Sequence, residues 1–597
     1  MKHRQDIQIL RGLAVIFVVL FHLEIAGLKS GFLGVDVFFV VSGFLMAILY
    51  KQGEAKKFFE RRAKRLLPAY FAIVTLTLLA SLFVVLPSEL PQVVEQSIYS
   101  LFFANNIGFW MQNSYFSKSE FNPLLHLWSL GVEIQFYLIV PLLVWFFRKS
   151  KLLLPFTLIG SFAACVLVVG ISPKTSFFMM PLRMWEFLIG FLVAQYLTTE
   201  GNLKFKHFSW VGGAALLVLV AIPFIPVDGQ SLNRLKAHPS FFALVVCFST
   251  ALIMSFGLPK LIENSFIGRT MARIGDYSYS IYLVHFPIIV LYLYEPFSGT
   301  KLYPESYVDK GVLLILIIIA SIAMHNLVEV RRFNNIAKAY LASFVSIFIL
   351  TGATKIVPTM MYSEQEKNIF NGLEDRATYR CGKLVRITDP KAISCKINLE
   401  DFTDSVLLVG NSHADSIKMA FSEAASKRRL NTFFLVSNTP LLGSSLTPEK
   451  LINEAKKLHV KHLILHYSPQ SIKSEVIEKV IVLAEKHNIK VDFILPVPIY
   501  IESVPKIIYQ NNLAAQYDIK KYQADNEQFF DELSLLKVKY KKFQVHEVAN
   551  IFCKTQCVIS DIVKHPYYFD DDHLNLTGAK LLNPVFNEVL KGSIDDS

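Results

Sequence analysis

Eleven runs of mainly apolar residues fill the first 357 residues of the chain. Each run has about 18–22 residues, enough for a helix to cross a hydrocarbon core of roughly 30 Å. Residues 358–597 instead alternate polar and apolar segments of ordinary length. The chain is therefore expected to hold a multi-span α-helical membrane domain followed by a soluble one. The spans are predicted at residues 8–28, 32–50, 68–87, 126–147, 151–171, 179–198, 208–226, 239–257, 277–296, 311–329 and 338–357.

Lys and Arg gather in every second loop between these spans. The net charge of +12 could indicate a nucleic-acid partner, but an excess of positive charge in the cytoplasmic loops explains it better. We therefore expect membrane lipid and no nucleic acid as partners, with the N-terminus in the cytoplasm. With an odd number of spans, the C-terminal part lies outside the cytoplasm. The basic loops are residues 1–4, 51–67, 148–151, 200–207, 257–273 and 329–338.

One further apolar segment, residues 94–112, is left out of the count of spans. Counting it as a twelfth span would move the basic loop 148–151 to the other side of the membrane and invert everything after it. We expect this segment to form a re-entrant or interfacial helix on the outer face.

Four of the six cysteines lie in the soluble part, as two local pairs. Even, paired cysteines predict the disulfides Cys381–Cys395 and Cys553–Cys557 and an oxidising compartment. A zinc site is the alternative, but neither spacing is C-x2-C and the pairs are far apart in the sequence. No metal is expected.

The soluble part alternates strand-like and helical patterns, which predicts a mainly parallel sheet with helices on both faces, as in flavodoxin-like α/β domains. Residues 358–400 are interpreted as a linker with a small disulfide-closed lead-in. The last helical pattern is expected to be capped by Thr577. Strands are predicted near residues 405–410, 431–436, 461–467, 491–496 and 543–548.

Charged side chains at membrane depth cost roughly 2.5–3.5 kcal/mol on insertion scales, so they usually have a function. Arg11 and His22 are eleven residues apart in the first span, about three helical turns, and face the same way. A neutral buried imidazole is a good general base, although His22 could also be a polar residue satisfied by a neighbour. Arg183 and Glu186, at i and i+3, could form a purely structural ion pair. The other candidates in the spans are Asp36, Glu133 and His285.

The loop after the second span contains the run RRAKR, with Arg61, Arg62 and Arg65. One interpretation is a topology anchor. The other is a clamp for a phosphorylated ligand, because Arg forks bind phosphate oxygens in pairs.

Six segments in the membrane half resemble the acyltransferase-3 membrane family in sequence and order. They are IQILRGLAVIFVVLFH, GFLGVDVFFVVSGFLM, FFERRAKRLLPAY, PLLHLWSLGVEIQFYLIVPLL, PLRMWEFLIG and DYSYSIYLVHFPI, and the similarity covers residues 6 to about 330. Members of this family acylate, usually acetylate, cell-surface glycans with acyl-CoA from the cytoplasm. The resemblance implies that Arg11 and His22 are essential, with His22 as the catalytic base. It also implies that the stretch with Arg61, Arg62 and Arg65 binds acetyl-CoA, the donor substrate.

The stretch LVGNSHAD places Ser412 on a sharp Gly-Asn-Ser corner between a strand-like run and a helical pattern. A nucleophilic Ser needs a base, and the base needs an orienting carboxylate. The later stretch FDDDHLNL supplies both, as His573 and Asp570. Asp571 and Asp572 compete with Asp570, which the spacing favours. The neighbouring His413 is interpreted as structural.

Gly-x-Ser-His early and D-x-x-H-L late, on an α/β sheet, resemble the SGNH esterase/transferase family. The spacing CKTQC before D-x-x-H is familiar from SGNH domains fused to acyltransferase-3 cores. The resemblance implies Ser412 as nucleophile, His573 as base and Asp570 as its partner.

This sequence departs from the SGNH pattern at the oxyanion site. Asn411 stands where the family has Asp, and Tyr467 stands where many relatives carry Asn. Gly443 is a weak candidate for an oxyanion donor, and losing one such donor costs about 10²–10³ in rate.

The expected domains are a membrane domain at 1–335, the eleventh span with an extracytoplasmic linker at 336–400, and an SGNH domain at 401–597. The layout most resembles bacterial O-antigen (lipopolysaccharide) O-acetyltransferases, with peptidoglycan O-acetyltransferases second. We therefore expect acetyl transfer from cytoplasmic acetyl-CoA to a hydroxyl of a surface polysaccharide, such as a lipid-linked one. The protein would lie in the bacterial inner membrane, with a periplasmic C-terminal domain.

Two other functions are compatible with parts of the sequence. A transporter would need inverted repeats, and none is detected. A membrane-anchored glycan esterase would use the Ser-His-Asp set equally well, but it leaves Arg11, His22 and the RRAKR loop unexplained.

Overall fold

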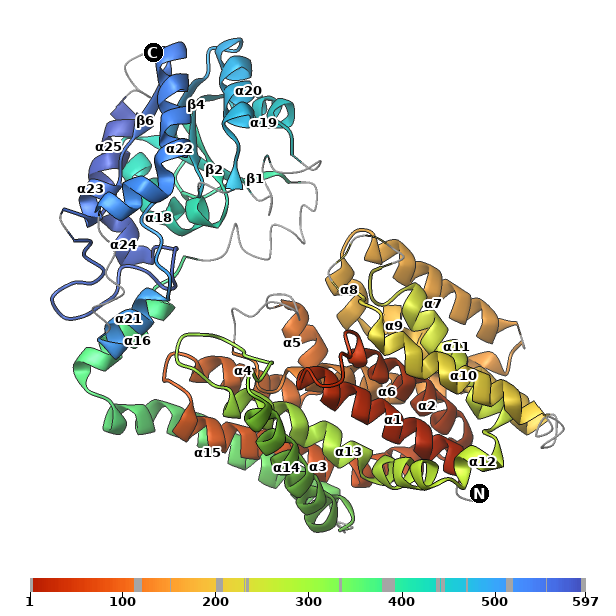
Figure 1. Cartoon of the computed structure of the whole chain (residues 1–597). Coiled ribbons are helices and arrows are strands. Elements are labelled where there is room, and N and C mark those ends of the chain that lie inside the picture. The colour runs from red at the N-terminus through yellow and green to blue at the C-terminus, as the bar shows by residue number, and fades with distance from the viewer. Residues whose placement is uncertain are drawn as a thin grey trace. The chain divides into compact units, whose positions relative to one another are not determined.

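The computed structural model describes residues 4–591 except 112–120, 151, 200–207, 230, 232, 234–235, 332–334, 378–391, 436–440, 442–445, 469–470, 512–518 and 555. The chain divides into two compact units, Met1–Met360 and Met361–Ser597. The first is helical and the second contains the sheet, as the red-to-green and green-to-blue parts of Figure 1 show.

Helices of very different length build the first unit. Seven helical segments among the described residues are long and apolar enough to cross a membrane, and they contain α1, α2, α3, α6, α13, α14 and α15. The helices are α1 (Gln5–His22), α2 (Gly34–Leu49), α3 (Ala55–Val84), α4 (Leu90–Leu101), α5 (Asn105–Met111), α6 (Trp128–Phe147), α7 (Leu153–Val169), α8 (Pro173–Phe178), α9 (Met180–Thr199), α10 (Ser209–Ala221), α11 (Phe241–Phe256), α12 (Lys260–Glu263), α13 (Phe266–Tyr292), α14 (Tyr307–Met324) and α15 (Ile336–Met361).

Every predicted span overlaps one of these helices, but the structure does not establish a count of eleven. The helices α7, α10 and α11 are shorter than a full span, and α9, which carries Arg183 and Glu186, is not among the seven segments. The segment 94–112 breaks into α4 and α5, with Phe103 between them in the left-handed region at φ 53°. The 12 residues of α4 extend only about 18 Å, so this segment is not a full span.

Polar caps mark several helix ends in this apolar sequence. The Ser265 hydroxyl accepts the N–H of Gly268 at the start of α13, and the Ser306 hydroxyl accepts the N–H of Val308 at the start of α14. Gly257, at φ 74°, ends α11. Such caps satisfy or redirect backbone groups that a helix end leaves unpaired.

Two glycines let α2 and α9 approach backbone to backbone. A Cβ atom on Gly43 would lie 1.9 Å from the Phe187 carbonyl oxygen, and one on Gly190 would lie 1.9 Å from the Val40 carbonyl oxygen. Small residues at helix interfaces allow this kind of close packing in membranes. The contact aligns Asp36 on α2 with the charged residues of α9, which the site depends on.

The second unit is a three-layer α/β structure around a six-stranded sheet in the order β1-β3-β2-β4-β5-β6. The strands β2 to β6 are parallel to their neighbours, and β1 is antiparallel to β3. The strands are β1 (Ser394–Lys396), β2 (Asp404–Gly410), β3 (Leu430–Leu435), β4 (Val460–His466), β5 (Lys490–Ile494) and β6 (Phe543–His546).

Helices in two groups cover this sheet, one group with α18, α24 and α25 and the other with α19, α20 and α22 (Figure 1). Successive strand residues point to opposite faces, so Leu407 and Val409 join the core under the second group. The helices are α16 (Glu364–Glu374), α18 (Ser412–Lys427), α19 (Pro448–Lys457), α20 (Ser474–Glu485), α21 (Val504–Gln510), α22 (Ile519–Lys539), α23 (Ala549–Phe552), α24 (Leu576–Lys580) and α25 (Asn583–Lys591).

All five predicted strands are present, but the sheet is mixed rather than purely parallel. The extra strand β1 and the helix α16 both lie in the stretch interpreted as a linker and lead-in, and both pack within the second unit. The predicted final helix is split into α24 and α25, and its cap is Asn575 rather than Thr577. The Asn575 side chain accepts the N–H of Gly578 at 2.7 Å.

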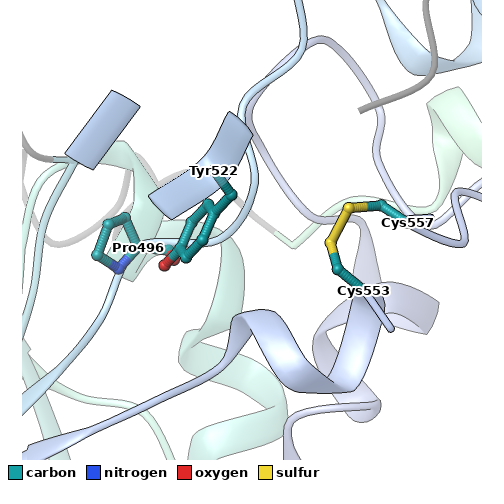
Figure 2. The surroundings of a disulfide bond; sticks show 4 residues. All are labelled: Pro496, Tyr522, Cys553 and Cys557. Atoms are coloured by element: carbon teal, nitrogen blue, oxygen red, sulfur yellow. A yellow bond between two sulfur atoms is a disulfide. The ribbon is translucent and has the colours of Figure 1, made fainter. Parts of the chain in front are cut away.

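The disulfide Cys553–Cys557 is present, as predicted (Figure 2). In the same region the Tyr522 hydroxyl donates to the Pro496 carbonyl at 2.7 Å and ties α22 to the segment after β5. Cys395 is also disulfide-bonded. Its predicted partner, Cys381, lies outside the described residues.

We predict that Gly190→Val destabilises the first unit, because the new side chain would meet the backbone of Val40 and Phe44. Overpacking of this kind costs typically about 1–3 kcal/mol. The measurement is the melting temperature of the detergent-purified full-length protein. The matched control is Gly160→Val on α7, where an added Cβ meets nothing within 4 Å. Equal melting temperatures for the two variants would contradict the packing argument.

Candidate active site

The corner after β2 positions Ser412 as the first residue of α18. Gly410 leaves no room for a side chain, since a Cβ there would lie 1.9 Å from the His466 carbonyl oxygen. Asn411 is the N-cap: its side-chain oxygen accepts the N–H of His413 at 3.1 Å. Its amide donates to the hydroxyls of Ser468 and Ser471, at 3.1 and 2.8 Å. The unpaired N–H groups and dipole of the helix start therefore lie beside the Ser412 hydroxyl.

Ser412, His573 and Asp570 form a connected chain, although 161 residues separate the first two. The His573 Nε2 atom lies 2.6 Å from Ser412 Oγ, and its Nδ1 atom lies 2.9 Å from Asp570 Oδ2. Asp570 Oδ1 also accepts the backbone N–H of His573 at 2.7 Å, which fixes the turn that carries the base. The three side chains meet the geometry of a nucleophile, a base and an orienting carboxylate.

Asp572 is a second carboxylate on the same imidazole. Its Oδ1 atom lies 2.6 Å from His573 Nδ1, and its Oδ2 atom lies 3.1 Å from Nε2 of the buried His413. The spacing in the sequence favoured Asp570 over Asp572 as the partner of the base, and His413 was predicted to be structural. The structure instead shows Asp572 linking the two histidines, so the base has two carboxylates rather than one.

These carboxylates control the charge of the base. Burial alone would lower the pKa of His573, but the hydrogen bonds and charges of Asp570 and Asp572 outweigh it and raise the pKa to about 10. The pKa of Asp572 falls well below its usual range: burial opposes this, and the bonds from His413 and His573 prevail. The imidazolium form of His573 is therefore stabilised. That contribution to folding stability is complete below pH 6.5 and is lost as the pH rises through about 10.

Two departures from the SGNH pattern, Asn411 and Tyr467, lie in the described part of the chain. The candidate Gly443 lies outside the described residues. Tyr467 is fully buried after β4, and the next residue, Ser468, bonds to Asn411. At position 411 this chain has Asn where the family has Asp. The Asn411 side chain caps α18, and its amide donates two hydrogen bonds that an ionised Asp could not make.

In the first unit, Arg183 lies in a fully buried network that joins three of the predicted residues. Its guanidinium lies 3.1 Å from Asp36 Oδ1 and 2.9 Å from Glu186 Oε1. A fourth member, His238, places Nε2 at 3.0 Å from Arg183 Nη1 and was not singled out from the sequence. Every charge in this network is paired, as a charge without exposed surface requires.

Arg11, Arg62 and Arg65 line a cavity of about 80 Å³ in the first unit. Arg61 is not among the residues that line it. Glu133 lies in the same cavity and accepts hydrogen bonds from the hydroxyls of Ser42 and Tyr137. Three guanidinium groups around one hollow offer donors suited to phosphate.

His22 lines a second, smaller cavity of about 10 Å³ together with His126 and His238. The rings of His22 and His285 lie 5.3 Å apart between centroids. Val35 and Tyr282 line both cavities, so the arginine-lined and histidine-lined spaces are adjacent. His126 was not predicted as a site residue, because it lies between apolar neighbours in PLLHLWSL.

Comparisons with known proteins match both units. A family model described as an acyltransferase domain matches residues 4–324, and one described as an SGNH domain fused to AT3 domains matches residues 380–588. The putative membrane-bound transacylase BcsY of Komagataeibacter xylinus is 32% identical over 341 residues, 55% of this chain and 82% of that protein.

Two further relatives are O-acetyltransferases. The O-acetyltransferase OatA of Staphylococcus aureus is 30% identical over 307 residues, 47% of this chain and 50% of that protein. The peptidoglycan O-acetyltransferase OatA of Listeria monocytogenes is 32% identical over 314 residues, 49% of this chain and 50% of that protein. The chain thus spans about half the length of these two relatives.

Among solved structures, the periplasmic domain of the lipopolysaccharide acetyltransferase of Salmonella ser. Paratyphi A aligns with 38% of this chain and 97% of its own. The identity is 15% and the TM-score is 0.29.

We predict that Asp572→Asn makes Ser412 reactive at lower pH. Removing one carboxylate lowers the pKa of His573, so more of the base is unprotonated near neutrality; a nearby opposite charge shifts a pKa by about 1–3 units. The measurement is the rate at which a fluorophosphonate labels Ser412 in the full-length protein, between about pH 6 and 10.

Asp571→Asn is the matched control, since Asp571 is the adjacent carboxylate, whereas the groups whose hydrogen bonds raise the pKa of His573 are Asp570 and Asp572. A profile that shifts equally in both variants would show that Asp572 has no special effect on the base.

Proposed function

Because the chain belongs to the acyltransferase-3 family and carries a fused SGNH domain, we propose that it transfers an acetyl group from cytoplasmic acetyl-CoA across the membrane to a hydroxyl of a cell-surface polysaccharide. The observation that carries this proposal is the connected set of Ser412, His573 and Asp570 in the second unit. A membrane domain and a separate nucleophile suit a reaction whose donor and acceptor lie on opposite sides of a membrane.

In the proposed reaction, Ser412 is an acyl relay. Its Oγ atom attacks the carbonyl carbon of an activated acetyl group supplied by the membrane half, and His573 takes the hydroxyl proton. The bond to the donor breaks, and His573 returns the proton to the leaving atom. A sugar hydroxyl then attacks the acetyl-serine, again with His573 as base, and the Ser412 hydroxyl is restored. The helix N-terminus at Ser412 favours the negative charge of both intermediates.

The donor side of the proposal rests on the arginine-lined cavity. Arg62 and Arg65 lie in the first part of the helix α3, where the sequence predicted a loop, and Arg11 lines the same cavity from α1. Guanidinium groups would bind the phosphates of acetyl-CoA. His22, in the adjacent cavity, would serve as the base that starts acyl transfer.

The proposed orientation has the N-terminus in the cytoplasm and the second unit in the periplasm of a bacterial inner membrane. The basic loops on one side of the predicted spans support it. The disulfide Cys553–Cys557 also supports it, since disulfides persist in oxidising compartments.

For the acceptor, we propose the sugars of lipopolysaccharide O-antigen in a lipid-linked form, because the layout of a membrane domain followed by an SGNH domain resembles O-antigen acetyltransferases. Peptidoglycan is the second candidate. The observation in its favour is the match to a relative named as a peptidoglycan O-acetyltransferase. Mass spectrometry of O-acetyl groups in the lipopolysaccharide and peptidoglycan of deletion and complemented cells separates the two.

We predict that Ser412→Ala lowers glycan O-acetylation by about 10³-fold or more, since the nucleophile of a relay cannot be replaced by its neighbours. The measurement is the O-acetyl content of surface glycans in cells that express each variant at equal level. Ser426→Ala on the same helix, roughly 21 Å further along, is the control. Unchanged acetylation in Ser412→Ala would reject the relay, and increased acetylation would identify an esterase.

We predict that Arg62→Ala combined with Arg65→Ala weakens CoA binding by about tenfold or more, because hydrogen bonds to charged groups contribute roughly 1.5–3 kcal/mol each. Calorimetry of CoA binding to the detergent-purified full-length protein measures it. Arg61 lies on the same helix, α3, but does not line the cavity, so Arg61→Ala should stay within about twofold of the native affinity. Equal effects of both changes would leave the basic run with a role in membrane topology alone.

A further inference from the structure

Three buried imidazoles from three helical elements converge beside the small cavity of the first unit. His22 ends α1, His126 lies in the short 3-10 helix Leu125–Leu127, and His285 lies on α13. The ring of His285 is 5.3 Å from that of His22 and 5.7 Å from that of His126, between centroids. All three side chains are at most 3% exposed.

Each ring is held through one of its nitrogens by backbone carbonyl oxygen. His22 Nδ1 lies 2.8 Å from the Val18 oxygen, His285 Nδ1 lies 2.7 Å from the Tyr282 oxygen, and His126 Nε2 lies 3.0 Å from the Leu283 oxygen. A carbonyl oxygen only accepts, so the bonded nitrogen carries the hydrogen. In a neutral imidazole the other nitrogen is then the basic one.

The basic nitrogen of His126 is Nδ1, and in the part of the chain that the structure describes it is buried without a hydrogen-bond partner. Buried polar atoms are nearly always paired, so an unpaired one calls for a functional explanation. His126 lines the same small cavity as His22, and His285 is not among the residues that line it. Two of the three imidazoles thus face one common space.

The histidines are not spaced for a metal ion. Among the described residues, the groups whose ligand atoms all lie within 4.8 Å of one another do not include these three. A zinc ion bound at about 2.0–2.1 Å from each nitrogen would need a closer set. Proton transfer is the chemistry that remains for the unpaired basic nitrogen of His126.

His126 is also the histidine tied to the arginine-lined cavity. Its backbone oxygen accepts hydrogen bonds from the hydroxyls of Tyr282 at 2.8 Å and Ser129 at 3.3 Å. Both of these residues line the cavity with Arg62 and Arg65. His126 thus lines the histidine-lined cavity and is hydrogen-bonded through its backbone to the wall of the arginine-lined cavity.

We propose that His126 is a second catalytic imidazole of the membrane half, acting on the sulfur of the donor while His22 acts on the attacking hydroxyl. This inference rests on the proposed function. The attacking hydroxyl belongs to an alcohol that carries the acetyl group onward as an ester, and His22 removes its proton as the oxygen bonds to the acetyl carbon. His126 accepts that proton from His22 and delivers it to the sulfur as the carbon–sulfur bond breaks. Both imidazoles end neutral, and the products are the acetyl ester and the free thiol of CoA.

The test distinguishes the effect of the basic nitrogen of His126, Nδ1, from that of the hydrogen bond between its Nε2 and the Leu283 oxygen. In His126→Gln, the side-chain amide nitrogen can still donate to the Leu283 oxygen, but the variant has no basic nitrogen. We expect glycan acetylation to fall by about 10²-fold or more, the usual contribution of general acid–base catalysis. CoA affinity and melting temperature of the full-length protein should match the native values. A folded His126→Gln with native acetylation would overturn the proposal.

His22→Ala, measured in parallel, distinguishes a failure of the proposed function from a failure of the role proposed for His126. Native acetylation in His22→Ala would reject the proposed role of the core itself. An inactive His22→Ala beside an active His126→Gln would reject only the second imidazole. If His126→Gln does not fold, His126→Ala with added millimolar imidazole decides: restored acetylation supports the proposal, and no recovery in the folded variant overturns it.

Discussion

A guanidinium without any exposed surface governs the packing of the first unit, because such a charge is tolerated only when it is paired on all sides. Arg183 on α9 is bonded to Asp36 from α2, to Glu186 one turn along its own helix, and to His238 from the segment before α11. Removing one partner of a buried pair costs about 3–5 kcal/mol. The network therefore fixes α2 against α9, and α2 in turn supplies Val35 to the walls of both cavities.

The two units use the same side chain in opposite settings. His573 lies between two carboxylates that raise its pKa to about 10, so the imidazolium that forms when it takes the Ser412 proton is stabilised. His22 and His126 are instead held by backbone carbonyls, which orient a neutral ring without adding a negative charge. The first setting suits a base that must hold a proton between two half-reactions. The second suits bases that must be free of a proton at the start.

Local patterns predicted much of this protein, and contacts between distant segments account for the rest. The apolar periods of the helices and strands can be recognised in short stretches of sequence. The same is true of the spacing of Asp570 and His573. Spacing could not say that Asp572 also turns back onto the base, since three successive carboxylates look alike. Nor could it select His126, whose relation to His22 is set by the packing of separate helices. The strand β1 has three residues, too few to show an alternating pattern.

The contact of α2 with α9 at Gly43 and Gly190 joins two backbones rather than two sets of side chains. Side chains at an interface adapt by changing rotamers, whereas helical backbones in contact have no such freedom. Backbone atoms therefore restrict any sliding of α2 against α9 at this contact. Hinges in proteins are a few residues in loops or at the ends of elements. Phe103, between α4 and α5, occupies such a position, whereas the residues at the contact of α2 with α9 do not.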